Sequence, residues 1–487
     1  MKQAPAIIPA PMGEDRDRMA EQAFRRRVLT GRWSEDLKHT ITQAVGTKRA
    51  DAWKLPDTSS NPARQYCHAV SELYTRPPTV SHPTDAAGAA VVLRALTEAG
   101  WVSRMQALQP LTVGVREGIL RVDLVGERIV LREVDPSLVT AKGRPGDRGQ
   151  PRKVCEYRQR IDPRVRGRVS WVREVWDTRT ASVTLYDEQG DDVTAIHYGD
   201  TSYPYLYRDQ SGELRPIMPY IFYHATNTGR LFDPYEMGEI FTGTLMGGVY
   251  WSFFSHRLRS ASWPQRYTVG LTAAGIEPST NTFDGFGEGR RDIVVADPAV
   301  VLALEPIEDM TGQPMIGAFP DGSPLSEYVD AVTTYDRHTI STAGLDASEI
   351  QRMDGDPRSG YAISLSAHGK REAKRRFEGT FSASDALLCA TVARMLRGGV
   401  DTGRIVALAD RYANLPTGGY AVGYPALGLP PEEQRALSQE MTGLVSAGVL
   451  TIDEARQKLD AAGYFDDIGG LPAALPLTEI EEGDPNE

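Results

Sequence analysis

The amino-acid sequence predicts an α+β protein built from several structural units. At 487 residues, the chain is too long for one compact hydrophobic core. Short runs of alternating apolar and polar residues occupy 110–220 and indicate antiparallel strands, with turns at Gly118, Gly126 and Gln189–Gly190. Segments with apolar residues at a spacing of about 3.6 dominate the rest of the chain and indicate helices.

The part before the strands is predicted to be mostly helical, from Trp33 to about Ala99. Asn61–Pro62 and Pro77–Pro78 divide it, because proline interrupts or begins helices. The polar residues 1–30 end in the run Arg25–Arg26–Arg27, which fits a solvated arm or a first helix.

Two helices flank an irregular segment in the second half of the chain. A long periodic segment spans 233–262, and Pro264 ends it. Residues 264–322 are rich in glycine and proline. A second helix is predicted from Ser323, with Pro324 in the first helical position, to about Gly344.

Further helices follow a polar loop at 345–362, which has no periodic apolar face. One long helix is predicted over 366–396, and a helical hairpin begins at Pro430. In that hairpin, Gly448 suits a left-handed helix end, and Thr451 with Glu454 forms a capping box. The last ten residues carry five acidic residues and no basic ones, a composition typical of a disordered tail.

Composition and charge exclude several classes of protein. The three cysteines lie far apart, which argues against disulfides and zinc and suits a reducing compartment. The apolar stretch 240–254 is shorter than the ~20 residues that a membrane helix needs. We expect no membrane segment and no signal peptide. The net charge of −11 is unlike that of a protein that holds DNA firmly, because such affinity comes from neutralising phosphates.

The sequence shows little that suits catalysis, so an enzyme and a cofactor are not expected. It contains neither a P-loop nor a His-Glu-x-x-His motif, and its histidines lack metal-ligand spacing. The glycine-rich run at 284–289 does not open a helix after a strand. One alternative stays open, a Mg²⁺-dependent phage nuclease or other hydrolase. It would use an acidic cluster made of Asp346, Glu349, Asp354 and Asp356.

Three segments resemble parts of the portal proteins of tailed bacteriophages. Residues 231–271 resemble the family's first stem helix and the strand after it, and 359–365 (SGYAISL) resembles its Ser-Gly-x-Ala-Leu turn. Residues 444–456 (LVSAGVLTIDEAR) resemble the hairpin of its crown. The resemblance covers about 233–465, and it also includes the order in which the helices follow one another.

The resemblance implies a portal fold, with a mixed α/β wing, long stem and backbone helices, a clip excursion and a helical crown. The implied parts are a wing at 1–232, a first stem helix at 233–262, a clip at 263–322, a second stem helix at 323–342, a tunnel loop at 343–365, a backbone helix with a return to the wing at 366–429, a crown at 430–470 and an acidic tail at 471–487.

The resemblance also implies a structural role at the portal vertex of a capsid, after assembly in the host cytoplasm. Copies of the chain would form a closed ring, typically a dodecamer, around a channel for packaging and ejecting double-stranded DNA. The implied partners are the large terminase subunit, a head–tail adaptor, the major capsid protein and, as a further option, a scaffolding protein. A minor virion protein without a channel is a second alternative.

Charged residues of the implied channel are candidates for contact with DNA. In the tunnel loop these are Arg352 and Arg358, beside Asp354 and Asp356, although the arginines could equally pair with neighbouring carboxylates. A basic cluster consists of Lys370, Arg371, Lys374, Arg375 and Arg376. At helical spacing it covers most of the circumference, so it cannot all face a channel. It would form salt bridges between subunits or a ring of DNA-facing charge.

A second basic segment carries six arginines between Arg158 and Arg173, with Asp162 the one acidic residue among them. We expect these arginines to decorate the surface of a strand. Contact with the surrounding capsid or with encapsidated DNA is the alternative.

Overall fold

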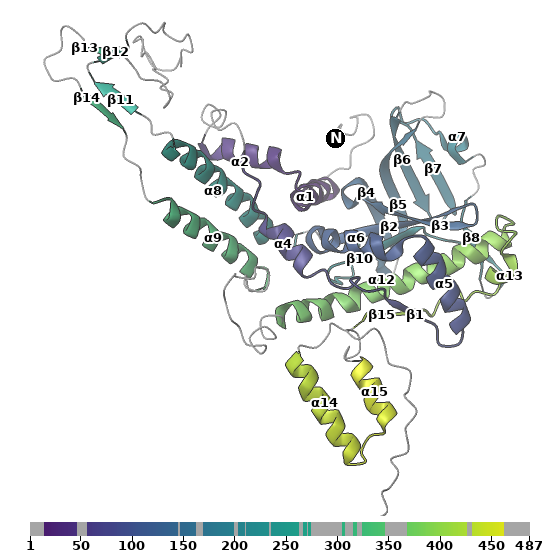
Figure 1. The fold of residues 1–487 in the computed structure, drawn as a ribbon. Coiled ribbons are helices and arrows are strands. Elements are labelled where there is room, and N and C mark those ends of the chain that lie inside the picture. The colour runs from purple at the N-terminus through teal and green to yellow at the C-terminus, as the bar shows by residue number, and fades with distance from the viewer. Residues whose placement is uncertain are drawn as a thin grey trace, which may run out of the picture. The chain divides into compact units, whose positions relative to one another are not determined.

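The computed structural model describes most of the chain and shows an α+β protein (Figure 1). The described residues are 14–45, 56–144, 147–161, 169–198, 203–209, 211–232, 235–262, 266–269, 271–273, 304–306, 315–318, 324–345, 368–425 and 431–461. They divide into two compact units. The first draws on Met1–Trp33, Asn61–Phe241 and Thr339–Glu487, and the second on Ser34–Ser60 and Thr242–His338. No helix in these ranges is long and apolar enough to cross a membrane.

Helices form the N-terminal part of the first unit. They are α1 (Glu14–Leu29), α4 (Pro62–Ala69), α5 (Ala86–Glu98) and α6 (Trp101–Val115). The predicted break at Asn61–Pro62 is confirmed, since the Asn61 side chain accepts from the amide of Arg64 and caps α4.

The arginine run near the N-terminus lies in α1 and is partly buried rather than solvated. Arg25 is 1% exposed and donates to the carbonyl of Glu236 at 2.7 Å. Arg26 pairs with Glu133 and Asp135. No local pattern indicates this burial, because these partners lie more than a hundred residues further along the chain.

A three-stranded antiparallel sheet has the order β10–β2–β3, with β2 at Glu117–Val125, β3 at Arg128–Val134 and β10 at Tyr220–His224. The predicted turn at Gly126 is confirmed by its φ of +60°. The turn predicted at Gly118 is wrong, because Gly118 lies within β2 opposite Tyr223. A Cβ there would collide with the Thr112 side chain of α6, so glycine permits the close approach of helix and strand.

The strand predicted from residue 111 is also wrong at its beginning, because Leu111–Val115 continue α6. Alternating β-branched residues suit a strand and a buried helix turn almost equally over so short a run. The Thr112 hydroxyl donates to the Leu108 carbonyl one turn earlier, as in a helix.

A four-stranded antiparallel sheet has the order β4–β5–β6–β7. Its strands are β4 (Val139–Arg144), which follows the short helix η1 (Pro136–Leu138), β5 (Asp147–Ile161), β6 (Val169–Asp177) and β7 (Ser182–Tyr186). The turn predicted at Gln189–Gly190 is confirmed by the φ of +89° at Gly190. Helix α7 (Thr194–Tyr198) follows. Trp176 lies at the centre of one apolar core that joins residues of both sheets.

Helix α12 (His368–Asp401) runs along the first unit and contacts several strands (Figure 1). The Ser384 hydroxyl donates to the Phe222 carbonyl of β10. Gly398 lies directly on the backbone of Leu206, in the hairpin of β8 (Leu206–Arg208) and β9 (Leu214–Pro216). The same helix contacts α13 (Ala409–Tyr412) and β15 (Ala421–Gly423). Strand β15 pairs with β1 (Thr79–Ser81).

The C-terminal helices α14 (Pro431–Ser446) and α15 (Ile452–Ala461) form the hairpin that the sequence predicts. Gly448 has a φ of +69°, which confirms the left-handed helix end. The Glu454 carboxylate accepts from the amide and hydroxyl of Thr451, and the Thr451 hydroxyl accepts from the amide of Glu454. This exchange is a complete capping box.

The second unit contains α2 (Ser34–Val45), most of α8 (Gly238–Ser262) and most of α9 (Leu325–Ser341). Two pairs of short strands lie between α8 and α9 in the chain. Strand β11 (Arg266–Val269) pairs with β14 (Met315–Ala318), and β12 (Leu271–Ala273) pairs with β13 (Leu304–Pro306).

Candidate functional site

The second unit contains a two-helix arm, which we define as α8 and α9 with the strand pairs β11–β14 and β12–β13. Tyr250 of α8 meets Tyr335 of α9, with ring centroids 5.1 Å apart, and Phe254, one turn later, stacks on Tyr328. Residue numbers therefore rise along α8 as they fall along α9, so the helices are antiparallel. The four strands between them pair in nested order, β11 with β14 outside β12 with β13.

A glycine brings the two helices of the arm close together. A Cβ at Gly247 would lie 2.8 Å from a carboxylate oxygen of Asp336 on α9, nearer than carbon and oxygen approach. Asp336 is buried and accepts from the Ser60 hydroxyl at 2.5 Å and from the Trp251 indole at 2.9 Å. The carboxylate thus joins three segments of the second unit through neutral donors.

A short N-terminal segment of the same unit is fastened to the middle of α8. The amide of Asp57 donates to the Ser252 hydroxyl at 2.8 Å, and the Ser255 hydroxyl donates to the Asp57 carboxylate at 2.7 Å. Burial opposes the charge, but the bonds from Ser59 and Ser255 outweigh it and lower the pKa of Asp57.

The tunnel-loop candidates lie outside the described residues. These are Arg352, Asp354, Asp356 and Arg358, together with Asp346 and Glu349 of the alternative magnesium site. Their predicted roles stay predictions. Among the residues that the structure describes, no group of three or more side chains could hold a metal ion.

The basic cluster does not share one face of α12. Lys374 is buried and donates to the Pro425 carbonyl at 2.6 Å. Arg376 lies over the Phe377 ring, with 5.0 Å from its guanidinium carbon to the ring centroid. Arg375 is exposed, Lys370 is half-buried, and the Arg371 side chain lies outside the described part. The cluster is divided between intramolecular packing and a solvated face, so Lys374 is no candidate for contact with DNA.

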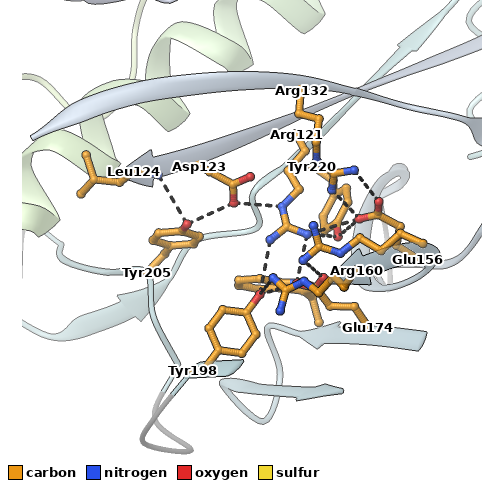
Figure 2. Close-up of polar contacts among 12 residues, drawn as sticks. Arg121, Asp123, Leu124, Arg132, Glu156, Arg160, Glu174, Tyr198, Tyr205 and Tyr220 are labelled. Carbon is orange, nitrogen blue, oxygen red and sulfur yellow. Dashed lines mark hydrogen bonds and ion pairs between the residues drawn. The ribbon is translucent and has the colours of Figure 1, made fainter. Parts of the chain in front are cut away.

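A buried network of charges, drawn in Figure 2, connects the three-stranded sheet to the four-stranded sheet of the first unit. Glu156 of β5 and Glu174 of β6 face each other across the strand pair, a repulsive arrangement for two carboxylates. Arg121 of β2 relieves it with one nitrogen, which lies 3.2 Å from Glu156 and 3.0 Å from Glu174. The side chains of all three are at most 3% exposed.

Further donors complete the network at its edges. Arg132 of β3 holds Glu156 through two parallel bonds of 2.7 and 2.8 Å. The hydroxyls of Tyr220 and Tyr198 donate to Glu156 and Glu174, respectively. Burial opposes ionisation of Glu174, but Arg121, Arg158 and Arg160 outweigh it and lower its pKa to about 2. The carboxylates are therefore charged, and the network crosslinks the sheets.

This network corrects the prediction for the second basic segment. Arg158 pairs with the buried Glu174, and the Arg160 guanidinium lies over the Tyr198 ring. Arg173 lies over the Tyr186 ring. These three arginines are half-buried against side chains of their own unit, whereas Arg164, Arg166 and Arg168 lie outside the described residues. Their partners are distant in sequence, so the local charge pattern was misleading.

A second buried carboxylate lies on α12. Asp385 is 0% exposed and accepts from the hydroxyls of Tyr223 at 2.8 Å, Tyr74 at 2.7 Å and Tyr424 at 2.5 Å. Burial raises its pKa to about 6, and bonds from the three tyrosines limit the rise. We call this group the tyrosine cage. It ties α12 to β10 and to the segments after α4 and β15, and no sequence motif indicated it.

Comparisons with known proteins give no family for the chain. No protein-family model matches the sequence, and no curated protein matches it. Two solved chains are similar over most of their length. One, from the virion of a native gene transfer agent particle, is 14% identical and covers 82% of this chain and 90% of its own, with a TM-score of 0.37. The other, from the neck of an empty gene transfer agent particle, is 12% identical and covers 87% and 93%, with a TM-score of 0.36.

Proposed function

We propose that the chain is the subunit of a portal-type ring, a conduit for double-stranded DNA at one vertex of a viral capsid. The observation that carries the proposal is the two-helix arm. Helix α8 leads out to nested strand pairs and α9 returns antiparallel to it, held by Asp336, Tyr335 and Tyr328. A two-helix stem that ends in a clip requires this arrangement.

The order of the remaining helices supports the same proposal. Helix α12 follows α9 after the segment that contains the tunnel-loop candidates, and the capped hairpin of α14 and α15 comes last. In a portal these would be the backbone helix and the crown. Three segments resemble portal segments. Residues 231–271 include α8, residues 359–365 directly precede α12, and residues 444–456 connect α14 to α15.

The charge of the chain suits a conduit better than a DNA clamp. With a net charge of −11, the protein neutralises few phosphates overall, so DNA can slide through the ring. Arg352 and Arg358 are the proposed sites of transient phosphate contact, and Asp354 and Asp356 keep that contact weak. Arg375, an exposed member of the basic cluster, is the proposed contact for a neighbouring subunit or for DNA.

The proposed role is structural. The ring would have cyclic symmetry with heterologous contacts between copies, twelve being the expected number. The strand-paired end of the arm would receive the large terminase subunit during packaging and a head–tail adaptor afterwards. ATP hydrolysis would belong to the terminase, and the ring would sit in the virion beside the major capsid protein.

Negative-stain microscopy and native mass spectrometry of the purified full chain test the proposal. The expected result is closed rings with a central hole. Leu258 of α8 is 43% exposed, and we expect Leu258→Glu to prevent ring closure because it puts charge into a contact between stems. Ile196 of α7 is equally exposed, and Ile196→Glu is the matched control that should still form rings.

Two outcomes would overturn the proposal. A folded protein that stays monomeric at high concentration would favour a minor virion component without a channel. A Mg²⁺-dependent nuclease activity that Asp354→Ala abolishes would favour the enzyme that the acidic cluster could support.

A further inference from the structure

A cavity of about 170 Å³ lies in the first unit and is not part of the proposed conduit. Its lining comes from the edge of the four-stranded sheet, the β8–β9 hairpin, β10 and α12. The polar members are Arg144, Gln150, Tyr207, Thr391 and Arg394, and the apolar members include Pro151, Ile217, Met218, Ile221 and Leu387.

The floor of the cavity is apolar and its rim is cationic. Ile217, Met218 and Ile221 are buried, whereas Arg144 is exposed and Arg394 is half-buried. No acidic residue lines the cavity. A ligand for it should therefore combine apolar groups with negative charge.

Several hydrogen-bond donors of the rim have no described partner. The Arg394 guanidinium donates its Nε to the Thr417 carbonyl at 2.7 Å and lies over the Tyr207 ring. No hydrogen bond joins its two Nη groups, the Arg144 guanidinium or the Gln150 amide to a side chain that the structure describes, a set that does not include the side chain of Asp147 opposite Arg144. Two guanidinium groups on one rim suit the recognition of an acidic chain.

The chain itself contains a segment of the matching composition. Residues 475–482, with the sequence LPLTEIEE, combine Leu475, Leu477 and Ile480 with Glu479, Glu481 and Glu482. Pro476 fixes its own φ and disfavours a helical Leu475, which reduces the entropy that these two residues lose on binding. Between the end of α15 at Ala461 and Leu475, roughly 45–50 Å of chain is available at full extension.

We propose that residues 475–482 dock in this cavity, in their own subunit or in a neighbouring copy. The leucines and Ile480 would cover the floor formed by Ile217, Met218 and Ile221, and the glutamates would pair with Arg144 and Arg394. The acidic segment would then be a strap that fastens the C-terminal part of the chain to the first unit. This proposal does not depend on the DNA conduit.

Crosslinking of the full chain tests the strap. In the double variant Gln150→Cys/Thr478→Cys, a short bismaleimide should join the two positions at least ~10-fold faster than in the control Thr180→Cys/Thr478→Cys, because Thr180 is an exposed turn residue away from the cavity lining. Peptide mapping identifies the joined residues. Migration on a denaturing gel separates bonds within one chain from bonds between copies, and either kind supports the proposal.

Charge reversal gives the decisive comparison. Adding Arg144→Glu should slow the specific crosslink about tenfold, the equivalent of ~1.4 kcal/mol, and adding Glu481→Lys with Glu482→Lys should restore it. Arg144 is exposed at the end of β4, so this change should not unfold the protein. Equal rates for the specific and control pairs, or no response to Arg144→Glu, would overturn the proposal. Ring formation is scored separately and is unaffected by either result.

Discussion

Two sites of the first unit bury carboxylates and solve the same electrostatic problem in opposite ways. In the network between the sheets, Glu156 and Glu174 are neutralised by arginines. In the tyrosine cage, Asp385 accepts from three neutral hydroxyl donors. The pKa of Glu174 is lowered to about 2, whereas that of Asp385 is raised to about 6.

The two sites therefore respond to acid in opposite directions. For Glu174, the folded pKa lies below the unfolded one, so its stabilising effect is present above about pH 4.5 and is lost as the pH falls towards 2. For Asp385, the folded pKa lies above the unfolded one, so its favourable contribution is full below about pH 4 and is lost as the pH rises through 6. Cation pairing overcomes the cost of burial, but hydroxyl donors overcome only part of it.

The largest expected effect is the loss of the cation that bridges the sheets. Arg121→Met leaves two facing carboxylates with less compensation, and we expect it to lower the free energy of unfolding by about 3–5 kcal/mol. Urea denaturation measures the loss in the free energy of unfolding, and faster hydrogen exchange of the amides in β5 and β6 would show that the loss is local to these strands. Arg94→Met removes an exposed pair with Glu98 and should change stability by less than about 0.5 kcal/mol. Equal losses for the two variants would mean that the buried network stabilises the fold no more than an exposed ion pair does.

The next effect distinguishes the cage by its pH dependence. Between pH 7 and pH 5, protonation of Asp385 should stabilise the wild type by roughly 1 kcal/mol relative to Asp385→Asn, which has no proton to gain. His224 acts in the opposite direction, because burial lowers its pKa to about 4. The quantity to measure is therefore the difference between wild type and variant in urea unfolding at each pH. A difference that stays constant over this range would contradict the raised pKa.

The contrast between the sites also explains which features could be predicted from sequence. Helices α8, α12, α14 and α15 have local signals, such as the capping box of Thr451 and Glu454, and each lies close to its predicted range. The buried sites have no local signals, because their members are distant in the chain. Arg121 and Glu174 are 53 positions apart, and Tyr74 and Asp385 are 311 positions apart. Arg158 is indistinguishable from a surface arginine until the fold places Glu174 beside it.

Removal of single hydroxyls should sharpen the comparison. Tyr223 donates to Oδ1 of Asp385, whereas Tyr74 and Tyr424 both donate to Oδ2, and Tyr223→Phe should cost about 1.5–3 kcal/mol. Tyr220 donates to Glu156, which Arg132 also holds through two bonds, so Tyr220→Phe should cost only about 0.5–1.5 kcal/mol. Urea midpoints at pH 7 measure both, and a larger loss for Tyr220→Phe would reverse our ranking of the two sites.

The smallest effect concerns Asp336 of the second unit, which resembles the tyrosine cage because its donors are neutral. A methyl group at Gly247 would press on its carboxylate, so Gly247→Ala should destabilise by about 1 kcal/mol, the cost of overpacking less the gain in helix propensity. Gly379 of α12 has nothing within 4 Å of a built Cβ, so Gly379→Ala should stabilise by about 0.5–1 kcal/mol. The same substitution in two helices is thus expected to have opposite signs. If Gly247→Ala also stabilised the protein in urea denaturation, α8 and α9 would not be in the close contact on which the two-helix arm depends.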